Sequence, residues 1–273
     1  MNRSTASDSE TTADQEISLA QLLEKCGAGG ENNPVLLPQG WTQGRTAFGG
    51  LSTTMAYHAA SHIEPDLPPL RSCQVAFTGP LFGELTARTD MLRRGRNTAF
   101  VQADLFGEKG LGLHCNFIFA ASRETSITAF EMEKPEFPPI PNDADLHSGP
   151  AQFFTSKMEF VGKRIDTSIK THRLTRWMRL KDREGLDPVA EILCMGDSLP
   201  PSIMGMLDKN AMVSSMNWQV NIVADNIMTE NGWWLIDSRT HHADHGASSQ
   251  YMSIWNSERK LIATGMQSVA YYA

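Results

Sequence analysis

Residues 98–121, TAFVQADLFGEKGLGLHCNFIFAA, and residues 248–272, SSQYMSIWNSERKLIATGMQSVAYY, decide the fold. Each stretch holds two apolar runs with a polar turn between them, GEKG in the first and NSER in the second. Long apolar runs joined by short polar turns are typical of antiparallel strands. Because the pattern occurs once in each half of the chain, the sequence predicts two similar units, each with a meander of long strands.

A helix candidate precedes each meander. In the first half, residues 51–63 follow a Gly-Gly pair and carry an apolar residue at every fourth position, namely Leu51, Met55, Ala59 and Ile63. In the second half, Asp187-Pro188 supplies an N-cap and a proline at the first helical position, and the helix is predicted to end near Met195. A small unit with one buried helix needs a partner surface, so we expect the two units to pack together with a ligand at their seam.

The other apolar runs and one proline-rich run predict where the domains begin and end. Further strands are predicted over 35–41, 72–78, 84–93, 171–181, 214–223 and 233–239, with a short amphipathic helix over 17–25 that stops at Gly27. The run KPEFPPIP at 134–141 cannot form a regular helix or strand and indicates a linker. We therefore expect a disordered tail over 1–16, an N-terminal unit over 17–121, a linker over 122–170 and a C-terminal unit over 171–273.

Charge and composition exclude several classes of protein. The net charge of −7 argues against a nucleic-acid partner, which requires a basic surface. No apolar run approaches the roughly 20 residues of a membrane span, and the polar first residues do not form a secretory signal. The four cysteines show no CxxC pair, and three lie in apolar stretches, where a thiol acts as a small buried hydrophobe. We expect a cytoplasmic protein, and the layered fold leaves a homo-oligomer open.

Three parts of the chain resemble the acyl-CoA thioesterase II family. They are GRTAFGG at 44–50, LRRGR at 92–96, and the C-terminal segments WWL at 233–235 and LIATGMQ at 261–267. The similarity covers most of the chain outside the tail and the linker. It implies an α+β fold of two tandem hot-dog units, in which each helix is wrapped by an antiparallel sheet. It also implies hydrolysis of acyl-CoA-type thioesters, without a cofactor.

The resemblance implies a catalytic group in the second half. In the family, an Asp, a Thr or Ser, and a Gln activate a water, and these positions fall on Asp197, Ser215 and Gln267. Ser214, one register step away from Ser215, is the alternative candidate for the catalytic hydroxyl. Asp197 would accept the proton of the water, and a hydroxyl and an amide would hold the water in place, since each both donates and accepts hydrogen bonds. The chain has no Gly-x-Ser-x-Gly elbow, which argues against an α/β serine hydrolase.

The start of the first long helix has two interpretations. The backbone N–H groups of Gly50 and Leu51 could polarise a thioester carbonyl, because unpaired N–H groups and the positive end of the helix dipole lie there. Alternatively, the glycines only permit close packing of the helix on its neighbours.

Two charged or polar turns are candidates for substrate binding. Arg93, Arg94 and Arg96 could bind the phosphates of a CoA-like ligand, or could form a solvated hairpin turn. The HHADH run follows a predicted strand and ends in a turn, so its imidazoles would not converge on a metal as they do from one face of a helix. We expect no metal there, and place His242 and His245 at the border of the ligand groove.

Two departures from the family pattern favour a second function. Leu51 stands where the family has Gln after its Gly-Gly pair, and Ser268 stands where it has an acidic residue. A protein without turnover would be an acyl-thioester-binding module. A third possibility, a hot-dog enoyl-thioester hydratase, has the faint signature Gly196-Asp197 before Pro-Pro, but the His that such enzymes need after the proline is missing.

Overall fold

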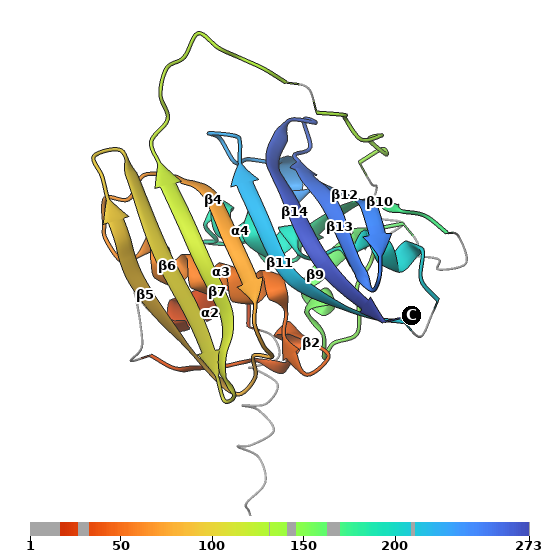
Figure 1. Cartoon of the computed structure of the whole chain (residues 1–273), viewed down its shortest axis with the longest axis horizontal. Coiled ribbons are helices and arrows are strands. Elements are labelled where there is room, and N and C mark those ends of the chain that lie inside the picture. Colours follow the sequence, from red (N-terminus) through yellow and green to blue (C-terminus); the bar gives the residue numbers. More distant parts are fainter. Residues whose placement is uncertain are drawn as a thin grey trace, which may run out of the picture.

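The computed structural model describes residues 17–26, 33–130, 132–140, 146–162, 170–208 and 211–272. Within these residues, one 12-stranded sheet has the order β1-β5-β6-β7-β4-β11-β14-β13-β12-β10-β9-β8. Figure 1 shows this sheet with the helices α2, α3 and α4 gathered on one of its faces. The expected tail over 1–16 and the expected helix stop at Gly27 lie outside the described residues.

The first half contains the predicted helix and meander. Its elements are α2 (Leu19–Cys26), β1 (Val35–Leu36), η1 (Gln39–Trp41), β2 (Thr42–Gln43), β3 (Thr46–Ala47), α3 (Gly49–Ser61), β4 (Leu70–Phe77), β5 (Glu84–Arg94), β6 (Thr98–Gly107) and β7 (Gly110–Ala120). β6 and β7 pair antiparallel from Thr98 and Ala120 down to Gly107 and Gly110, so the GEKG sequence forms the predicted hairpin turn. Gly110 has a φ of 92°, which favours glycine at this turn.

The second half repeats the arrangement. Its elements are β8 (Leu146–His147), η3 (Phe154–Lys157), β9 (Met158–Val161), β10 (Arg173–Leu180), α4 (Pro188–Gly196), η4 (Ser202–Gly205), β11 (Met212–Ile222), η5 (Glu230–Gly232), β12 (Trp234–Asp244), β13 (Ala247–Trp255) and β14 (Leu261–Tyr272). The predicted cap of α4 is confirmed, because the Asp187 carboxylate accepts a hydrogen bond of 2.8 Å from the Ala190 N–H and Pro188 follows it.

The two halves are joined through one strand pair. β4 of the first half pairs antiparallel with β11 of the second, with Trp218 opposite Val75. On the helical face, α3 and α4 lie against each other, and the Thr54 hydroxyl donates to the Ala190 carbonyl at 3.3 Å. A Cβ on Gly50 would lie 2.4 Å from the Cys194 carbonyl oxygen, so only glycine permits this close approach. The seam therefore brings the start of α3 to the end of α4.

Helix α3 is buried on nearly all sides. Its apolar residues at every fourth position were expected to form one buried stripe, and the small residues between them are buried as well. Leu51 and Ala56 have no exposed surface at all. A helix that is apolar all round lies inside a protein, and here β5, β6, β7 and α4 surround it.

Two expectations were wrong in detail. The strand predicted over 35–41 is only β1, because Pro38 lacks an N–H for the ladder and a 3₁₀ turn follows it. The linker predicted over 122–170 contains β8, η3 and β9, and β9 pairs with β10 at the edge of the sheet. These strands have two and four residues, too short for a periodic pattern next to a proline-rich run.

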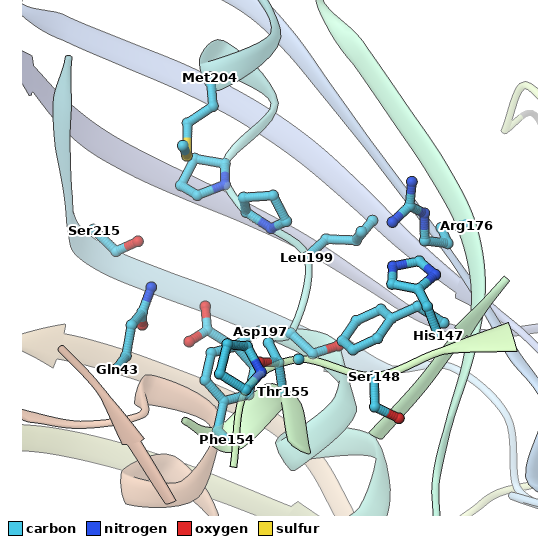
Figure 2. A pocket seen from close by; sticks show the side chains of 16 residues that line it. Gln43, His147, Ser148, Phe154, Thr155, Arg176, Asp197, Leu199, Met204 and Ser215 are labelled. Atoms are coloured by element: carbon cyan, nitrogen blue, oxygen red, sulfur yellow. The ribbon is translucent and has the colours of Figure 1, made fainter. Parts of the chain in front are cut away.

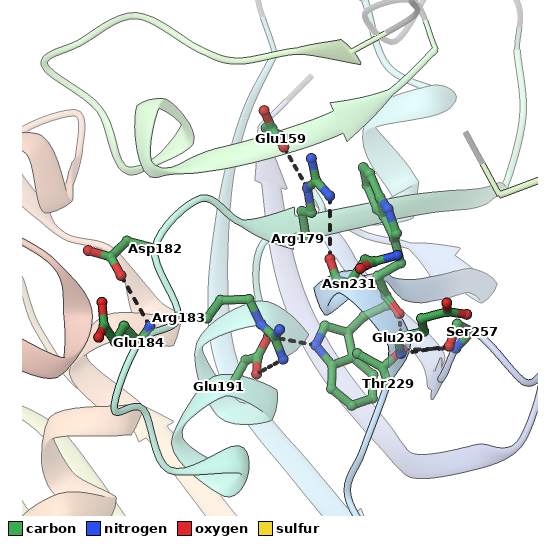
Figure 3. A network of polar contacts seen from close by, with 12 residues as sticks. Glu159, Arg179, Asp182, Arg183, Glu184, Glu191, Thr229, Glu230, Asn231 and Ser257 are labelled. Atoms are coloured by element: carbon green, nitrogen blue, oxygen red, sulfur yellow. Dashed lines mark hydrogen bonds and ion pairs between the residues drawn. The ribbon is translucent and has the colours of Figure 1, made fainter. Parts of the chain in front are cut away.

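The end of β10 and the helix α4 are tied together by a buried carboxylate (Figure 3). Glu191 is 3% exposed and binds the Arg183 guanidinium through two hydrogen bonds of 2.6 and 2.9 Å. It also accepts the indole N–H of Trp234 at 2.9 Å. A buried charge is tolerated when its oxygens are satisfied in this way, and the network fixes α4 against β12.

Three of the four cysteines are buried within the sheet or the helices. Cys73, Cys115 and Cys194 are buried free thiols, as expected, and burial raises the pKa of each. In the described ranges, none of the helices combines the length and apolar character needed to cross a bilayer.

Candidate active site

Asp197 is the C-cap of α4 and points at the start of α3. The helix ends there because the Ser198 N–H turns back to the Met195 carbonyl and Pro200-Pro201 follows. The backbone N–H of Gly50 donates a hydrogen bond to the Asp197 carboxylate. A Cβ on Gly49 would lie 2.4 Å from the Asp197 Oδ2. Gly49 therefore leaves room for the Asp197 carboxylate, and Gly50 binds it through its backbone N–H.

The second partner of the carboxylate is Gln267 of β14. Its Nε2 donates to the Asp197 Oδ1 at 3.1 Å. The side chain is 3% exposed, although a glutamine in a strand usually faces water. The structure therefore brings together two of the three residues of the predicted catalytic group.

A buried chain of hydrogen bonds fixes the orientation of the Gln267 amide. The Ser202 N–H, which can only donate, contacts the Gln250 Oε1 at 2.8 Å. The Gln250 Nε2 is then the group that donates to the Gln267 Oε1 at 2.6 Å. The Gln267 Nε2 therefore faces the Asp197 carboxylate. The Ser202 N–H, through Gln250, thus determines which end of the Gln267 amide points to Asp197.

The pKa of Asp197 lies near neutrality. Burial raises the pKa of its carboxyl to about 7, and the hydrogen bonds from Gln267 and Gly50 act in the opposite direction. A carboxyl with a pKa near the working pH can both take up and return a proton. The group is half-buried because part of its surface opens onto the cavities described next.

Two cavities meet at Asp197. One has a volume of about 380 Å³ and lies among α4, β9 and β10, with apolar walls that include Phe154, Leu199 and Met204. The other has a volume of about 480 Å³ and runs toward the first half, along Thr46, Ser52, Thr78, Pro80 and Ser214. Four residues line both cavities, namely Gln43, Asp197, Pro201 and Ser215. A ligand that fills both would pass over the carboxylate.

Ser215 rather than Ser214 faces both cavities. Figure 2 shows the Ser215 hydroxyl projecting from β11 into the same space as Gln43 and Asp197. The pairing of β11 with β14 shifts register between Ser215 and Asn217, which leaves Met216 as an extra residue. Such a bulge reverses the alternation of side chains, so Ser215 lies on the same face as Trp218 despite the odd spacing. The sequence could not separate the two serines because the bulge is a property of the sheet.

Several predicted site residues lie away from the cavities. Arg93 and Arg94 end β5 and Arg96 lies in the turn that follows, at the opposite end of β6 from the cavity-lining Gly112 of β7. Arg94 is ion-paired with Glu64 at 2.5 Å. The structure therefore does not bring this turn to Asp197.

The predicted histidine and helix-start residues do not lie where a bound substrate was expected to contact them. His242 and His245 are exposed at the end of the β12–β13 hairpin. Among the described residues, no cluster of three His, Cys, Asp or Glu side chains could hold a metal. Leu51 is fully buried in α3. The Gly50 N–H, expected at a thioester carbonyl, is directed at Asp197 instead.

Four residues that line the cavities have no recognisable signal in the sequence. Gln43 lies in an exposed two-residue strand, and His147 and Phe154 lie within the expected linker. Arg176 lies in β10, where the apolar residues predict the strand but not a cavity. Phe154 stacks on Phe48 with ring centroids 3.8 Å apart, which ties the linker to the N-cap of α3. No local pattern signals such a contact.

Solved structures define the class of the fold. A hot-dog-fold protein of unknown function from Alicyclobacillus acidocaldarius is 19% identical, with a TM-score of 0.80 over 92% of this chain and 98% of the other. A putative thioesterase II from Thermobifida fusca is 20% identical, with a TM-score of 0.74 over 90% and 94%. A TesB protein from Mycobacterium avium subspecies paratuberculosis is 14% identical, with a TM-score of 0.69 over 94% and 100%. The protein has a hot-dog fold.

Family models give the narrower assignment. The acyl-CoA thioesterase N-terminal domain matches residues 37–127, and the acyl-CoA thioesterase C-terminal domain matches residues 133–271. The protein is therefore a thioester hydrolase, and the chain belongs to the acyl-CoA thioesterase family. Among curated proteins, no sequence matches it.

Replacing Gly49 with Ala is expected to lower thioesterase activity by about 10- to 100-fold. The new Cβ would lie 2.4 Å from the Asp197 Oδ2 and 3.0 Å from the Phe77 ring, so the carboxylate has to move. A displacement of about 1 Å at a reacting group costs up to 10²-fold in rate. Steady-state thiol release measures the loss. Gly95→Ala in the remote β5–β6 turn is the control, and equal activity of both variants would contradict the close contact.

Proposed function

We propose that the chain is a tandem of two hot-dog units, residues 17–121 and 171–273, to the second of which the connecting segment 122–170 adds β8 and β9, and that it hydrolyses acyl-CoA-type thioesters. The observation that carries this proposal is the carboxylate of Asp197 at the junction of two cavities. One cavity is mostly apolar and suits an acyl chain, and the other is more polar and suits the thiol-bearing arm. The thioester bond then lies at the carboxylate.

The chemistry follows from the surroundings of Asp197. A water held between Asp197 and Ser215 attacks the thioester carbonyl, and the carboxylate accepts its proton. The Gln267 amide keeps the carboxylate in place by its hydrogen bond. The Gln43 amide, on the wall of both cavities, supplies a donor for the oxyanion. When the carbon–sulfur bond breaks, the thiolate takes the proton back from Asp197, which yields free acid and thiol.

The two departures from the family pattern lie away from the cavities. Leu51 has no exposed surface and packs within α3. Ser268 follows Gln267 in β14, so its side chain is on the opposite face of the sheet. These positions support turnover over a binding module, because neither residue alters the surroundings of Asp197.

The direct test is a panel of acyl-CoA thioesters from acetyl to palmitoyl, with free thiol release as the readout. We expect release with a preference for chains that the cavity of about 380 Å³ can hold. Hydration of crotonyl-CoA is measured in parallel. Binding without release, or hydration in place of release, would contradict the proposal.

The activity is expected to fall in acid. Only the carboxylate form of Asp197 accepts a proton, and its pKa is about 7. The value of kcat/KM should therefore be half-maximal near pH 7 and fall about tenfold per pH unit below it. Rates of octanoyl-CoA hydrolysis from pH 5 to 9 give the profile, with circular dichroism to confirm the fold at each pH. A flat profile down to pH 5 would remove Asp197 as the base.

A further inference from the structure

Two buried glutamines lie side by side next to Asp197. Gln250 of β13 and Gln267 of β14 are register partners in neighbouring strands, and the two residues are 2% and 3% exposed. Along β13 the alternate residues Met252 and Ile254 belong to the main core, so Gln250 occupies a position where the strand pattern favours an apolar side chain. A buried amide is tolerated when both of its ends are hydrogen-bonded.

The Gln250 amide has a single orientation. Its Oε1 accepts from the Ser202 N–H at 2.8 Å and from the Ser202 hydroxyl at 3.0 Å. The Thr240 hydroxyl, 2.8 Å from that of Ser202, then donates to it. If the Gln250 amide turned by 180°, its NH2 group would face the Ser202 N–H, and two donors would meet without an acceptor. Gln250 therefore presents its NH2 group to Gln267, whose Oε1 accepts at 2.6 Å.

This orientation makes Gln267 a donor, and only a donor, toward Asp197. An amide that is free to turn donates to a carboxylate through its NH2 group and accepts from a protonated carboxyl through its oxygen, so it favours neither form. Because Gln250 binds the Gln267 oxygen, only the Nε2 faces Asp197. The other partner, the Gly50 N–H, can also only donate. Both hydrogen bonds lower the pKa of Asp197, against the effect of burial.

Other titratable groups lie near Asp197. The Cys194 thiol, in the last turn of α4, stays neutral because burial raises its pKa well above the ordinary value. His147 and Arg176 lie on the wall of the apolar cavity (Figure 2). The substitutions described below leave all three groups unchanged, so a change in the titration of Asp197 reports on the glutamine pair.

We propose that Gln250 is a positioning residue of the thioesterase reaction. It holds the Gln267 amide as a donor, so that the site stabilises the form of Asp197 that accepts the proton of the attacking water. Gln250 itself lines neither of the two cavities and takes no part in the proton transfer. The inference rests on the proposed function for the role of Asp197 as the base.

Gln250→Met removes the group that fixes the Gln267 amide and keeps a side chain of similar length. The freed amide then serves both forms of Asp197, so the preference for the carboxylate should fall by roughly tenfold. With octanoyl-CoA, the midpoint of the pH profile of kcat/KM should move from near pH 7 to about pH 8. The rate should fall about fivefold at pH 7 and recover to within about twofold of wild type at pH 9. An equal loss at pH 7 and pH 9 would show a merely structural role and overturn the inference.

Two further variants complete the kinetic test. Gln267→Met removes the donor itself, and adding Gln250→Met to it should not move the midpoint further, since Gln250 acts through Gln267. Gln74→Met is the matched control, because Gln74 is exposed on the side of β4 that faces away from the core residues Cys73 and Val75. It should keep the wild-type profile. A Gln250→Met shift of the same size with and without Gln267 would overturn the inference.

Nuclear magnetic resonance of the wild-type protein tests the orientation without turnover and without a Gln250 variant. The side-chain NH2 signals of Gln267 are assigned by their loss in Gln267→Met. We expect one pair of signals, in slow exchange with water from pH 5 to pH 9, whose shifts follow the titration of Asp197. A second pair below pH 7 would show that the amide turns when Asp197 is protonated, and would overturn the inference even if thioesters are hydrolysed. One pair in a protein that hydrolyses no thioester would support the fixed orientation and contradict only the proposed function.

Discussion

Replacing Asp197 with Asn is expected to lower kcat for thioester hydrolysis by about 10²- to 10⁴-fold, because an amide cannot accept the proton of the attacking water. The substitution keeps the size of the side chain and an oxygen that can accept from the Gln267 amide. We therefore expect KM to change by less than about threefold. Thiol release from octanoyl-CoA under saturating conditions measures kcat. Asp90→Asn on the exposed surface of β5 is the control, and wild-type turnover in Asp197→Asn would exclude this carboxylate from the mechanism.

The same substitution should stabilise the folded protein in alkaline solution. Burial raises the pKa of Asp197 from 3.8 to about 7, so folding favours its protonated form. The contribution of this carboxyl to stability is then complete below about pH 4 and is lost as the pH rises through about 7. Asn has no charge to desolvate, so the free energy of unfolding at pH 8 should rise by roughly 1–3 kcal/mol. Lost activity with unchanged or greater stability separates a catalytic role from a structural one.

Replacing Glu191 with Ala is expected to lower the free energy of unfolding by about 2–4 kcal/mol. The change leaves the Arg183 guanidinium and the Trp234 indole N–H without the carboxylate that they bind. The Arg183 side chain is 33% exposed and can recover some hydration, which keeps the loss below that of a fully buried pair. Denaturant unfolding followed by tryptophan fluorescence gives the value.

A second ion pair in Figure 3 provides the matched comparison for Glu191. Glu159 binds Arg179 at a similar distance of 2.6 Å, and both of these side chains keep about a quarter of their surface in water. Because water screens such a pair, Glu159→Ala should cost about 1 kcal/mol or less. Equal losses for the two variants would show that burial of Glu191 does not determine its contribution.

The sequence predicted the main elements where the signal is local. Residues 98–121 form a hairpin as expected, because alternating apolar strands and a glycine-containing turn act over a few residues. The cap of α4 was also predictable, since Asp187 binds an N–H only three residues away. The short strands β8 and β9 were missed because they gain stability from the edge of the sheet and not from their own pattern.

The site was predictable only in part, and with the help of the family resemblance. Asp197 and Gln267 are 70 positions apart in the chain and share a hydrogen bond, which no local pattern indicates. The choice between Ser214 and Ser215 depends on a bulge in β11. The hydrogen bond from the Gly50 N–H to Asp197 forms because the end of α4 meets the start of α3, and this contact depends on packing between the two halves.

By itself, the sequence determined two helices that must be buried, two meanders of long strands, and an acidic chain in which nucleic acid is not expected to be a partner. These features depend on periodicity, composition and caps, which neighbouring residues define. Only the tertiary structure decided that Gln43 and Ser215 line the same cavities as Asp197, and that Arg176 lines the apolar one. The physical reason is that side chains alternate along a strand, so strand register and bulges determine which polar groups face inward.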